Sequence, residues 1–220
     1  MVRTRPGFVA LLVGMVAASV AAQHAPNPSS SPGQLWNALA AGNHRFASGK
    51  PERHDHVARR KELTATQNPH VAVLSCADSR VPPELIFDQG LGDLFVVRSA
   101  GESADPLSVG SIEYAFEHLG TSVVVVMGHQ KCGAVTAACS GEKAESPNLE
   151  AVVMPIASSC NTIDKNKSDT LDLAVRDHVH RVAEELLATS EMLKKAVNDG
   201  KLTIIEAYYS LDTGEVTKLH

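Results

Sequence analysis

Four short and almost uninterrupted apolar runs constrain the fold of this chain more than any other feature. They cover residues 71–74, 94–97, 123–127 and 202–208 and are rich in valine and isoleucine. A strand with one solvated face alternates apolar and polar residues, whereas a strand covered on both faces stays apolar throughout. The runs therefore predict buried strands of a mostly parallel sheet with helices on both of its faces.

The segments between the runs show helical periodicity. Apolar residues recur at helical spacing over residues 34–48, 106–119 and 171–186. Asp105 is a typical N-cap for the second of these helices, and Gly120 is a typical stop signal. Strands that alternate with helices predict a single α/β domain of about four parallel strands. A further short strand at 216–219, after a tight turn, is expected at an antiparallel edge.

The N-terminus has the pattern of a secretory signal. Arg3 and Arg5 precede an apolar run that ends in small residues and is too short to span a bilayer comfortably. We expect a signal peptide over residues 1–22, and so a secreted or periplasmic protein with no membrane association after cleavage; an uncleaved anchor is the alternative. Residues 23–33, rich in proline and serine, are predicted to be a linker, and residues 34–220 the folded domain.

Reactive side chains follow two of the predicted strands. Cys76, Asp78 and Arg80 come after the first run, and His129 and Cys132 come after the third. Because open α/β sheets place their sites at the carboxyl ends of strands, we expect these residues to meet there. Thiolates, imidazole and carboxylate are ligands of Zn²⁺, so the pattern predicts a zinc site. Each residue alone has a simpler interpretation, as a buried thiol or a surface ion pair.

A wider pattern surrounds these residues. Its segments are Cys-Ala-Asp-Ser-Arg-Val-Pro at 76–82, Phe-Val-Val-Arg at 95–98, Glu-Tyr-Ala at 113–115 and Gly-His-Gln-Lys-Cys-Gly at 128–133. Together they resemble the β-class carbonic anhydrases, and the similarity extends over roughly residues 35–219. The formal net charge of −5 agrees with an enzyme that binds no nucleic acid, since nucleic-acid binding usually needs a basic face.

The resemblance implies a site and a reaction. It implies one Zn²⁺ per chain, held by Cys76, His129 and Cys132, with water or Asp78 in the fourth position. It also implies that Asp78 and Arg80 form a catalytic dyad. The expected reaction is the reversible hydration of CO₂ to bicarbonate and a proton, by attack of zinc-bound hydroxide.

The resemblance further assigns Gln67 and Gly133 to substrate binding, although an exposed loop amide is the alternative for Gln67. It implies a homodimer or a dimer-based tetramer, in which the 34–48 helix packs on the partner near the zinc. The apolar stripe of this helix fits packing on its own domain equally well. Two positions depart from the family pattern. Glu102 stands where asparagine is frequent, and Val73 stands where some members have a tryptophan of an inhibitory bicarbonate pocket, so we do not expect that regulation.

The remaining cysteines and histidines leave alternatives open. Cys139 and Cys160 are predicted either to form a disulfide or to be two buried thiols. His178 and His180 are expected to pack or to face solvent rather than to carry protons. A hydrolase of CS₂ or COS with the same fold is one alternative function. The other is a secreted binding module without activity, which a permanently closed site with four protein ligands would favour.

Overall fold

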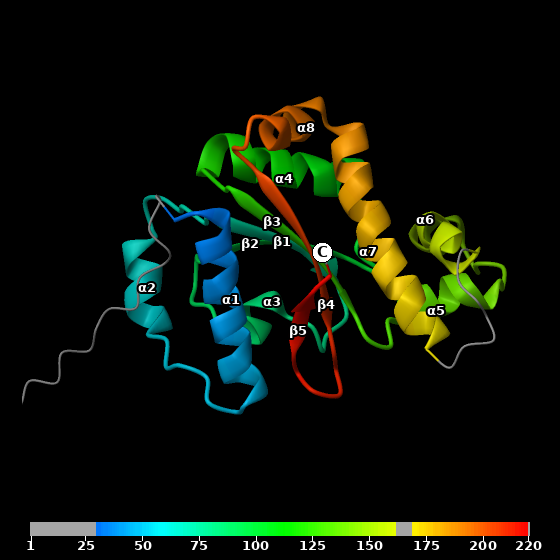
Figure 1. The fold of residues 1–220 in the computed structure, drawn as a ribbon, viewed down its shortest axis with the longest axis horizontal. Helices are drawn as coiled ribbons and strands as arrows, with labels where there is room; N and C mark the ends of the chain where they lie inside the picture. Colours follow the sequence, from blue (N-terminus) through cyan, green and yellow to red (C-terminus); the bar gives the residue numbers. More distant parts are fainter. Residues whose placement is uncertain (1–29, 162–168, 220) are drawn as a thin grey trace, which may run out of the picture.

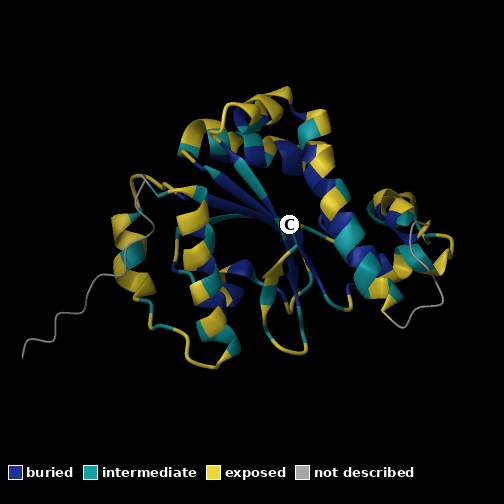
Figure 2. Cartoon of the chain, viewed as in Figure 1, coloured by how far each residue is buried: buried dark blue, intermediate teal, exposed yellow. Residues whose placement is uncertain are grey.

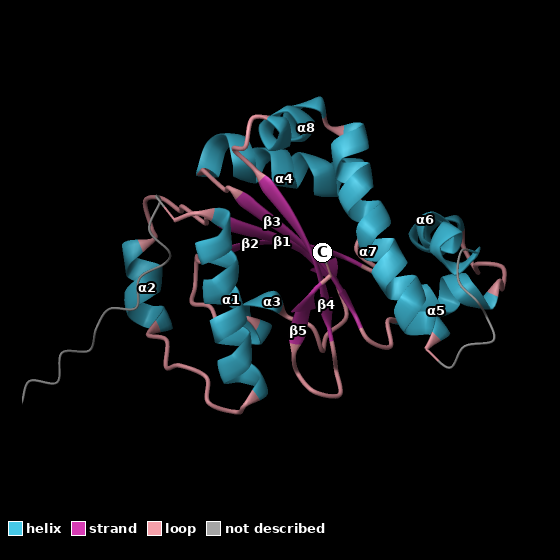
Figure 3. Ribbon diagram, viewed as in Figure 1, coloured by secondary structure: helices cyan, strands magenta, loops and turns pink. Residues whose placement is uncertain are grey.

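The computed structural model describes residues 30–161 and 169–219, and a five-stranded sheet lies at its centre (Figure 3). The strands are β1 (Val71–Cys76), β2 (Leu94–Ser99), β3 (Val123–His129), β4 (Thr203–Tyr209) and β5 (Val216–Lys218). Their order in the sheet is β2-β1-β3-β4-β5. The first four are parallel and β5 pairs with β4 in the antiparallel sense. The predicted fold class is therefore confirmed.

Helices cover both faces of the sheet. They are α1 (Pro32–Ala47), α2 (His56–Glu62), α3 (Pro83–Ile86), α4 (Pro106–Leu119), α5 (Gly133–Ser140), α6 (Pro147–Asn161), α7 (Thr170–Thr189) and α8 (Glu191–Asn198). Alternate side chains of β1 and β3 pack with α1 and α3 on one face, and the intervening ones pack with α4, α7 and α8 on the other. Figure 1 shows α1 and α3 on the opposite side of the sheet from α4 and α8.

The burial of the strands differs between the centre and the edge of the sheet. All residues of β1 and β3 are buried, as the apolar runs predict. The residues of β2 are half-buried or exposed, so the prediction that this strand is buried is wrong (Figure 2). The reason is its place at the edge, where β1 is its one partner in the described sheet. An apolar run alone does not distinguish an edge strand from a central one.

Local capping explains where two of the helices begin. Asp105 accepts hydrogen bonds from the backbone of Leu107 and Ser108, as predicted for the N-cap of α4. Helix α1 begins at Pro32, inside the predicted linker, because Ser31 and Gln34 form a reciprocal capping box. The predicted signal peptide and most of the linker lie outside the described residues. No helix in the described ranges is both long and apolar enough to cross a membrane.

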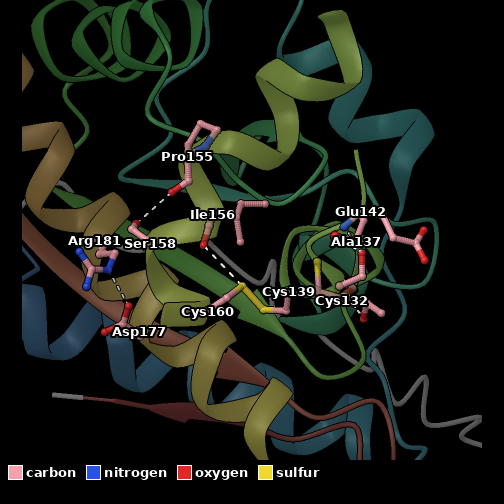
Figure 4. The surroundings of a disulfide bond; sticks show 12 residues. Cys132, Ala137, Cys139, Glu142, Pro155, Ile156, Ser158, Cys160, Asp177 and Arg181 are labelled. Carbon is pink, nitrogen blue, oxygen red and sulfur yellow. Dashed lines mark hydrogen bonds and ion pairs between the residues drawn. A yellow bond between two sulfur atoms is a disulfide. The ribbon is translucent and has the colours of Figure 1, made fainter. Parts of the chain in front are cut away.

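A disulfide joins α5 to α6. Cys139 and Cys160 are bonded, with their Cα atoms 5.2 Å apart (Figure 4), so the first of the two alternatives holds. Helix α6 is not predictable from its sequence, because Pro155 lies inside it and prolines usually interrupt helices. The bridge fixes α6 against the helix that directly follows Cys132.

Removal of this disulfide, which links residues 21 positions apart, is expected to destabilise the protein by about 3 kcal/mol. The reason is that the unfolded chain is no longer restricted by the closed loop and gains conformational entropy. Urea unfolding of the Cys139→Ser/Cys160→Ser variant measures the effect. Unchanged stability, or two alkylatable thiols at these positions in the unreduced wild-type protein, would contradict the bridge.

Candidate metal centre

Three buried side chains converge at the carboxyl end of the sheet. Cys76 ends β1, His129 ends β3, and Cys132 is the N-cap residue of α5. Their ligand atoms all lie within 4.8 Å of one another, and the two sulfur atoms are 3.9 Å apart. Strands β1 and β3 are neighbours, and the chain continues from β1 to β2 on one side and from β3 to β4 on the other. Open α/β sheets form their sites at such a switch point in the strand order. The structure thus brings together the three residues predicted from two distant motifs.

The histidine is oriented for a metal. Its Nδ1 atom lies 2.9 Å from the backbone carbonyl oxygen of Gln130, so Nδ1 carries the hydrogen and donates it. Its Nε2 atom is then an acceptor, and it is buried without a hydrogen-bond partner among the described residues. A buried lone pair facing two cysteine sulfurs fits Zn²⁺, which prefers nitrogen and sulfur ligands.

The two cysteine sulfurs lie close enough for one thiol to donate a hydrogen bond to the other. Hydrogen bonds from Cys132 and from the backbone of Gly101 and Asp78 lower the pKa of Cys76 to about 4, against the opposing effect of burial. The hydrogen bond to Cys76, followed by burial, raises the pKa of Cys132. Metal binding therefore has to displace the proton of Cys132, and the two resulting thiolates balance the +2 charge of zinc.

Asp78 is held beside the cluster by Arg80. The guanidinium Nε and Nη2 atoms lie 2.9 and 2.7 Å from the two carboxylate oxygens. This pairing keeps the pKa of Asp78 well below its usual range. The nearer oxygen of Asp78 is 4.0 Å from His129 Nε2. Arg98 also orders the segment, since it donates to the carbonyl oxygens of Cys76 and Asp78.

The two residues assigned to substrate binding lie in different places. Gly133 is exposed at the start of α5, next to Cys132, and a Cβ atom there would meet no other atom within 4 Å. Gln67 is exposed and precedes β1, whereas Cys76 ends that strand. The strand between them is about 20 Å long, farther than a glutamine side chain reaches. Within one chain, the structure does not bring Gln67 to the metal ligands.

Contacts with Asp212 hold the loop between His129 and Cys132, and these contacts were not predicted from the sequence. Lys131 adopts a positive φ of 56°, and its ammonium group lies 2.8 Å from a carboxylate oxygen of Asp212. Gln130 donates to the other oxygen of Asp212 and accepts from its backbone. These contacts join residues about 80 positions apart, and no local pattern in the sequence indicates them.

Glu102 is buried next to this centre. It is 1% exposed, and neither of its carboxylate oxygens has a hydrogen-bond partner in the described part of the chain. A Cβ atom on Gly128 would lie 2.6 Å from Val179 Cγ2, 2.7 Å from Val175 Cγ1 and 3.1 Å from one of these oxygens, so any larger residue there would displace its neighbours. Burial, and then the charge of Cys76, raises the pKa of Glu102 well above its usual value. The departure from the family pattern is therefore a buried carboxyl group whose environment favours the protonated form.

This carboxyl group makes stability depend on pH. Above the usual glutamate pKa, residue 102 ionises in the unfolded chain but stays protonated in the folded one, so the free energy of unfolding falls as pH rises. The slope approaches about 1.4 kcal/mol per pH unit. The Glu102→Gln variant should lack this slope when both zinc-loaded proteins are unfolded in urea between pH 5 and 8. Parallel profiles for the two proteins would show that Glu102 is ionised in the folded state.

Comparison with known proteins identifies the family. The family model described as carbonic anhydrase matches residues 71–216, a span that contains all three convergent ligands and the Asp78–Arg80 pair. The chain belongs to the β-carbonic anhydrase family. Carbonic anhydrase 2 of Mycobacterium tuberculosis is 39% identical over 191 residues, which are 85% of this chain and 92% of the relative. The carbonic anhydrase of Mycolicibacterium smegmatis is 37% identical over 193 residues, 86% of this chain and 94% of the relative.

Solved structures of carbonic anhydrases share the fold. A tetrameric β-carbonic anhydrase of Sordaria macrospora matches with a TM-score of 0.67 and 20% identity, over 84% of this chain and 96% of that one. The sequence relatives and the Cys76, His129 and Cys132 cluster together show that this carbonic anhydrase is an enzyme whose cofactor is zinc.

Proposed function

We propose that this carbonic anhydrase catalyses the reversible hydration of CO₂ with Asp78 and Arg80 as its catalytic residues. The observation that carries the proposal is the position of Asp78, which lies beside the three metal ligands but is paired with Arg80 through both oxygens. A site closed by four protein ligands would leave no position for a reacting water. The pairing with Arg80 supports a site with an open fourth position.

Zinc in this site supplies the Lewis acid that generates hydroxide from water near neutral pH. The carboxylate of Asp78 accepts a hydrogen bond from the attacking hydroxide and so directs its lone pair at the carbon of CO₂. The net reaction would be CO₂ + H₂O → HCO₃⁻ + H⁺, with Cys76, His129 and Cys132 as the residues that would hold the metal and Asp78 as the acceptor that would orient the nucleophile. Asp78 remains ionised throughout this cycle because the guanidinium of Arg80 keeps its pKa low.

Arg80 has a second effect on the charge of the site. Coordination of Asp78 would give the metal three anionic ligands and a net charge of −1, which weakens a Lewis acid and fills the position needed for the nucleophile. The two charge-assisted hydrogen bonds from Arg80 compete with that coordination. The backbone N–H of Arg80 donates to the same carboxylate at 2.9 Å and adds to the restraint.

Substrate binding is proposed to use Gly133 of the same chain and Gln67 of a second copy. The open space at Gly133 supports the first assignment. The second is supported by the position of Gln67 at the opposite end of β1 from the ligands of its own chain, because it could then contact substrate only at the site of another chain. A substitution of Gln67 that lowers activity only in the assembled protein would support this arrangement, and equal loss in monomers would contradict it.

A homodimer or a dimer-based tetramer is the proposed assembly. The edge of β2, which carries no further strand among residues 30–161 and 169–219, supports it, together with the exposed side chains of Leu107 and Tyr114 on α4. Leu35 and Leu39 of α1 are buried in their own domain, so this face of α1 is not available for a partner. Sedimentation at the mass of a single chain would contradict the assembly.

Secretion or export to the periplasm is proposed from the N-terminal pattern, and the Cys139–Cys160 disulfide supports it because such bonds persist in oxidising compartments. Mass spectrometry of the exported protein should find Gln23 at its N-terminus. Recovery of the full-length chain from the reducing cytosol alone would contradict the proposal.

The proposed activity depends on the metal. Removal of zinc by a chelator is expected to abolish CO₂ hydration, and one equivalent of zinc added under reducing conditions should restore it. Stopped-flow measurement of the pH change during hydration gives both rates. Activity that persists in fully zinc-free protein would contradict the proposal.

A further inference from the structure

A buried histidine of α7 contacts the segment that follows β2. His178 is 1% exposed, and its Nε2 atom lies 3.0 Å from the carbonyl oxygen of Gly101 and 3.1 Å from that of Glu102. Both neighbours are carbonyl oxygens, which only accept, so Nε2 carries the hydrogen and donates it to them. Burial lowers the pKa of His178, in agreement with a neutral ring.

The same segment contacts a metal ligand from its other side. The backbone N–H of Gly101 donates to the sulfur of Cys76 at 3.3 Å. Gly101 has a φ of 66°, and a Cβ atom there would lie 2.6 Å from Ile156 Cδ1 and 2.8 Å from Ala134 Cβ. Helices α5 and α6 therefore restrict where this segment can lie, while His178 fixes the direction of its carbonyl groups.

We propose that His178 is a positioning residue for the metal centre. His178 holds the backbone of Gly101 and Glu102 so that the N–H of Gly101 points at the Cys76 sulfur. The hydrogen bond from Gly101 withdraws electron density from the thiolate and fixes its direction. Groups that orient the ligands of a metal typically change its affinity by about 10–100-fold when they are removed. This inference rests on zinc binding at Cys76, His129 and Cys132.

The test variants are chosen by whether they can replace the hydrogen bond that Nε2 of His178 donates. The side-chain amide of glutamine places an N–H near the position of histidine Nε2, whereas the amide of asparagine is shorter and reaches the position of Nδ1. We expect His178→Leu and His178→Asn to release zinc to a colorimetric chelator about 10-fold faster than the wild type. His178→Gln should remain within about twofold. His180→Leu, two residues away on the same helix, is the matched control because its ring contacts Glu206 instead.

A second readout separates positioning from simple packing. In the cobalt-substituted proteins, the sulfur-to-cobalt charge-transfer band should shift in His178→Leu and His178→Asn but not in His178→Gln or His180→Leu. Equal zinc release by wild type and His178→Leu would overturn the inference, as would equally fast release by the Gln and Asn variants. If the Leu variant does not fold, the comparison of Gln with Asn decides alone. Failure of the wild type to bind zinc would instead reject the proposed function.

Discussion

Replacement of Cys132 with alanine is expected to leave a folded protein that binds no stoichiometric zinc and has no measurable CO₂ hydration. Cys132 is 2% exposed and supplies one of three convergent ligands, so its loss leaves one thiolate and one imidazole. Two ligands do not retain zinc against a chelator in a site built for at least three. Zinc content by elemental analysis and hydration by stopped flow measure the result on the same sample.

The Cys139→Ala/Cys160→Ala variant is the matched control, because it also removes cysteines from α5 and α6 but no ligand. Under conditions where it stays folded, it should keep one zinc per chain and most of its activity. A full complement of zinc in the Cys132→Ala protein would place the metal elsewhere and contradict the assigned centre.

Substitution of Asp78 with asparagine is expected to retain most of the zinc but to lower kcat by about 100-fold or more. The amide has nearly the same shape, but it removes the negative charge that pairs with Arg80 and the acceptor that orients the nucleophile. The effect should fall on kcat rather than on zinc affinity, because Cys76, His129 and Cys132 remain in place.

Asp199→Asn provides the control for this substitution, since Asp199 pairs with Lys195 and Lys201 on the surface away from the metal ligands. Its kcat should equal that of the wild type. If Asp78→Asn also kept full activity, Asp78 and Arg80 would have no part in catalysis, and the pair would be a surface ion pair.

The centre of the fold and the metal ligands were predictable from the sequence because both depend on local patterns. The run at 123–127 is apolar at every position, as a central strand requires, and His129 and Cys132 follow it directly. Strand β2 has a similar composition but lies at the edge of the sheet, and position in the sheet is a property of tertiary pairing. Helix α6 was missed because Pro155 lies inside it.

The supports of the site were not predictable for a different reason. His178 reaches Gly101 and Glu102 across 77 and 76 positions of the chain, and Asp212 reaches Gln130 across 82. Nothing in the sequence near His178 or Asp212 indicates these distant partners. Likewise, the departure at Glu102 was visible, but its burial with no hydrogen-bond partner among the described residues was not.

The most direct test of the account measures zinc content and CO₂ hydration on one sample of the purified protein, with pH varied from about 6.5 to 9. The account predicts one zinc per chain and a hydration rate that rises with pH, because hydroxide must form while Asp78 stays ionised. Full zinc occupancy with no hydration at any pH would contradict it, and would favour a structural metal site or a CS₂-type substrate instead.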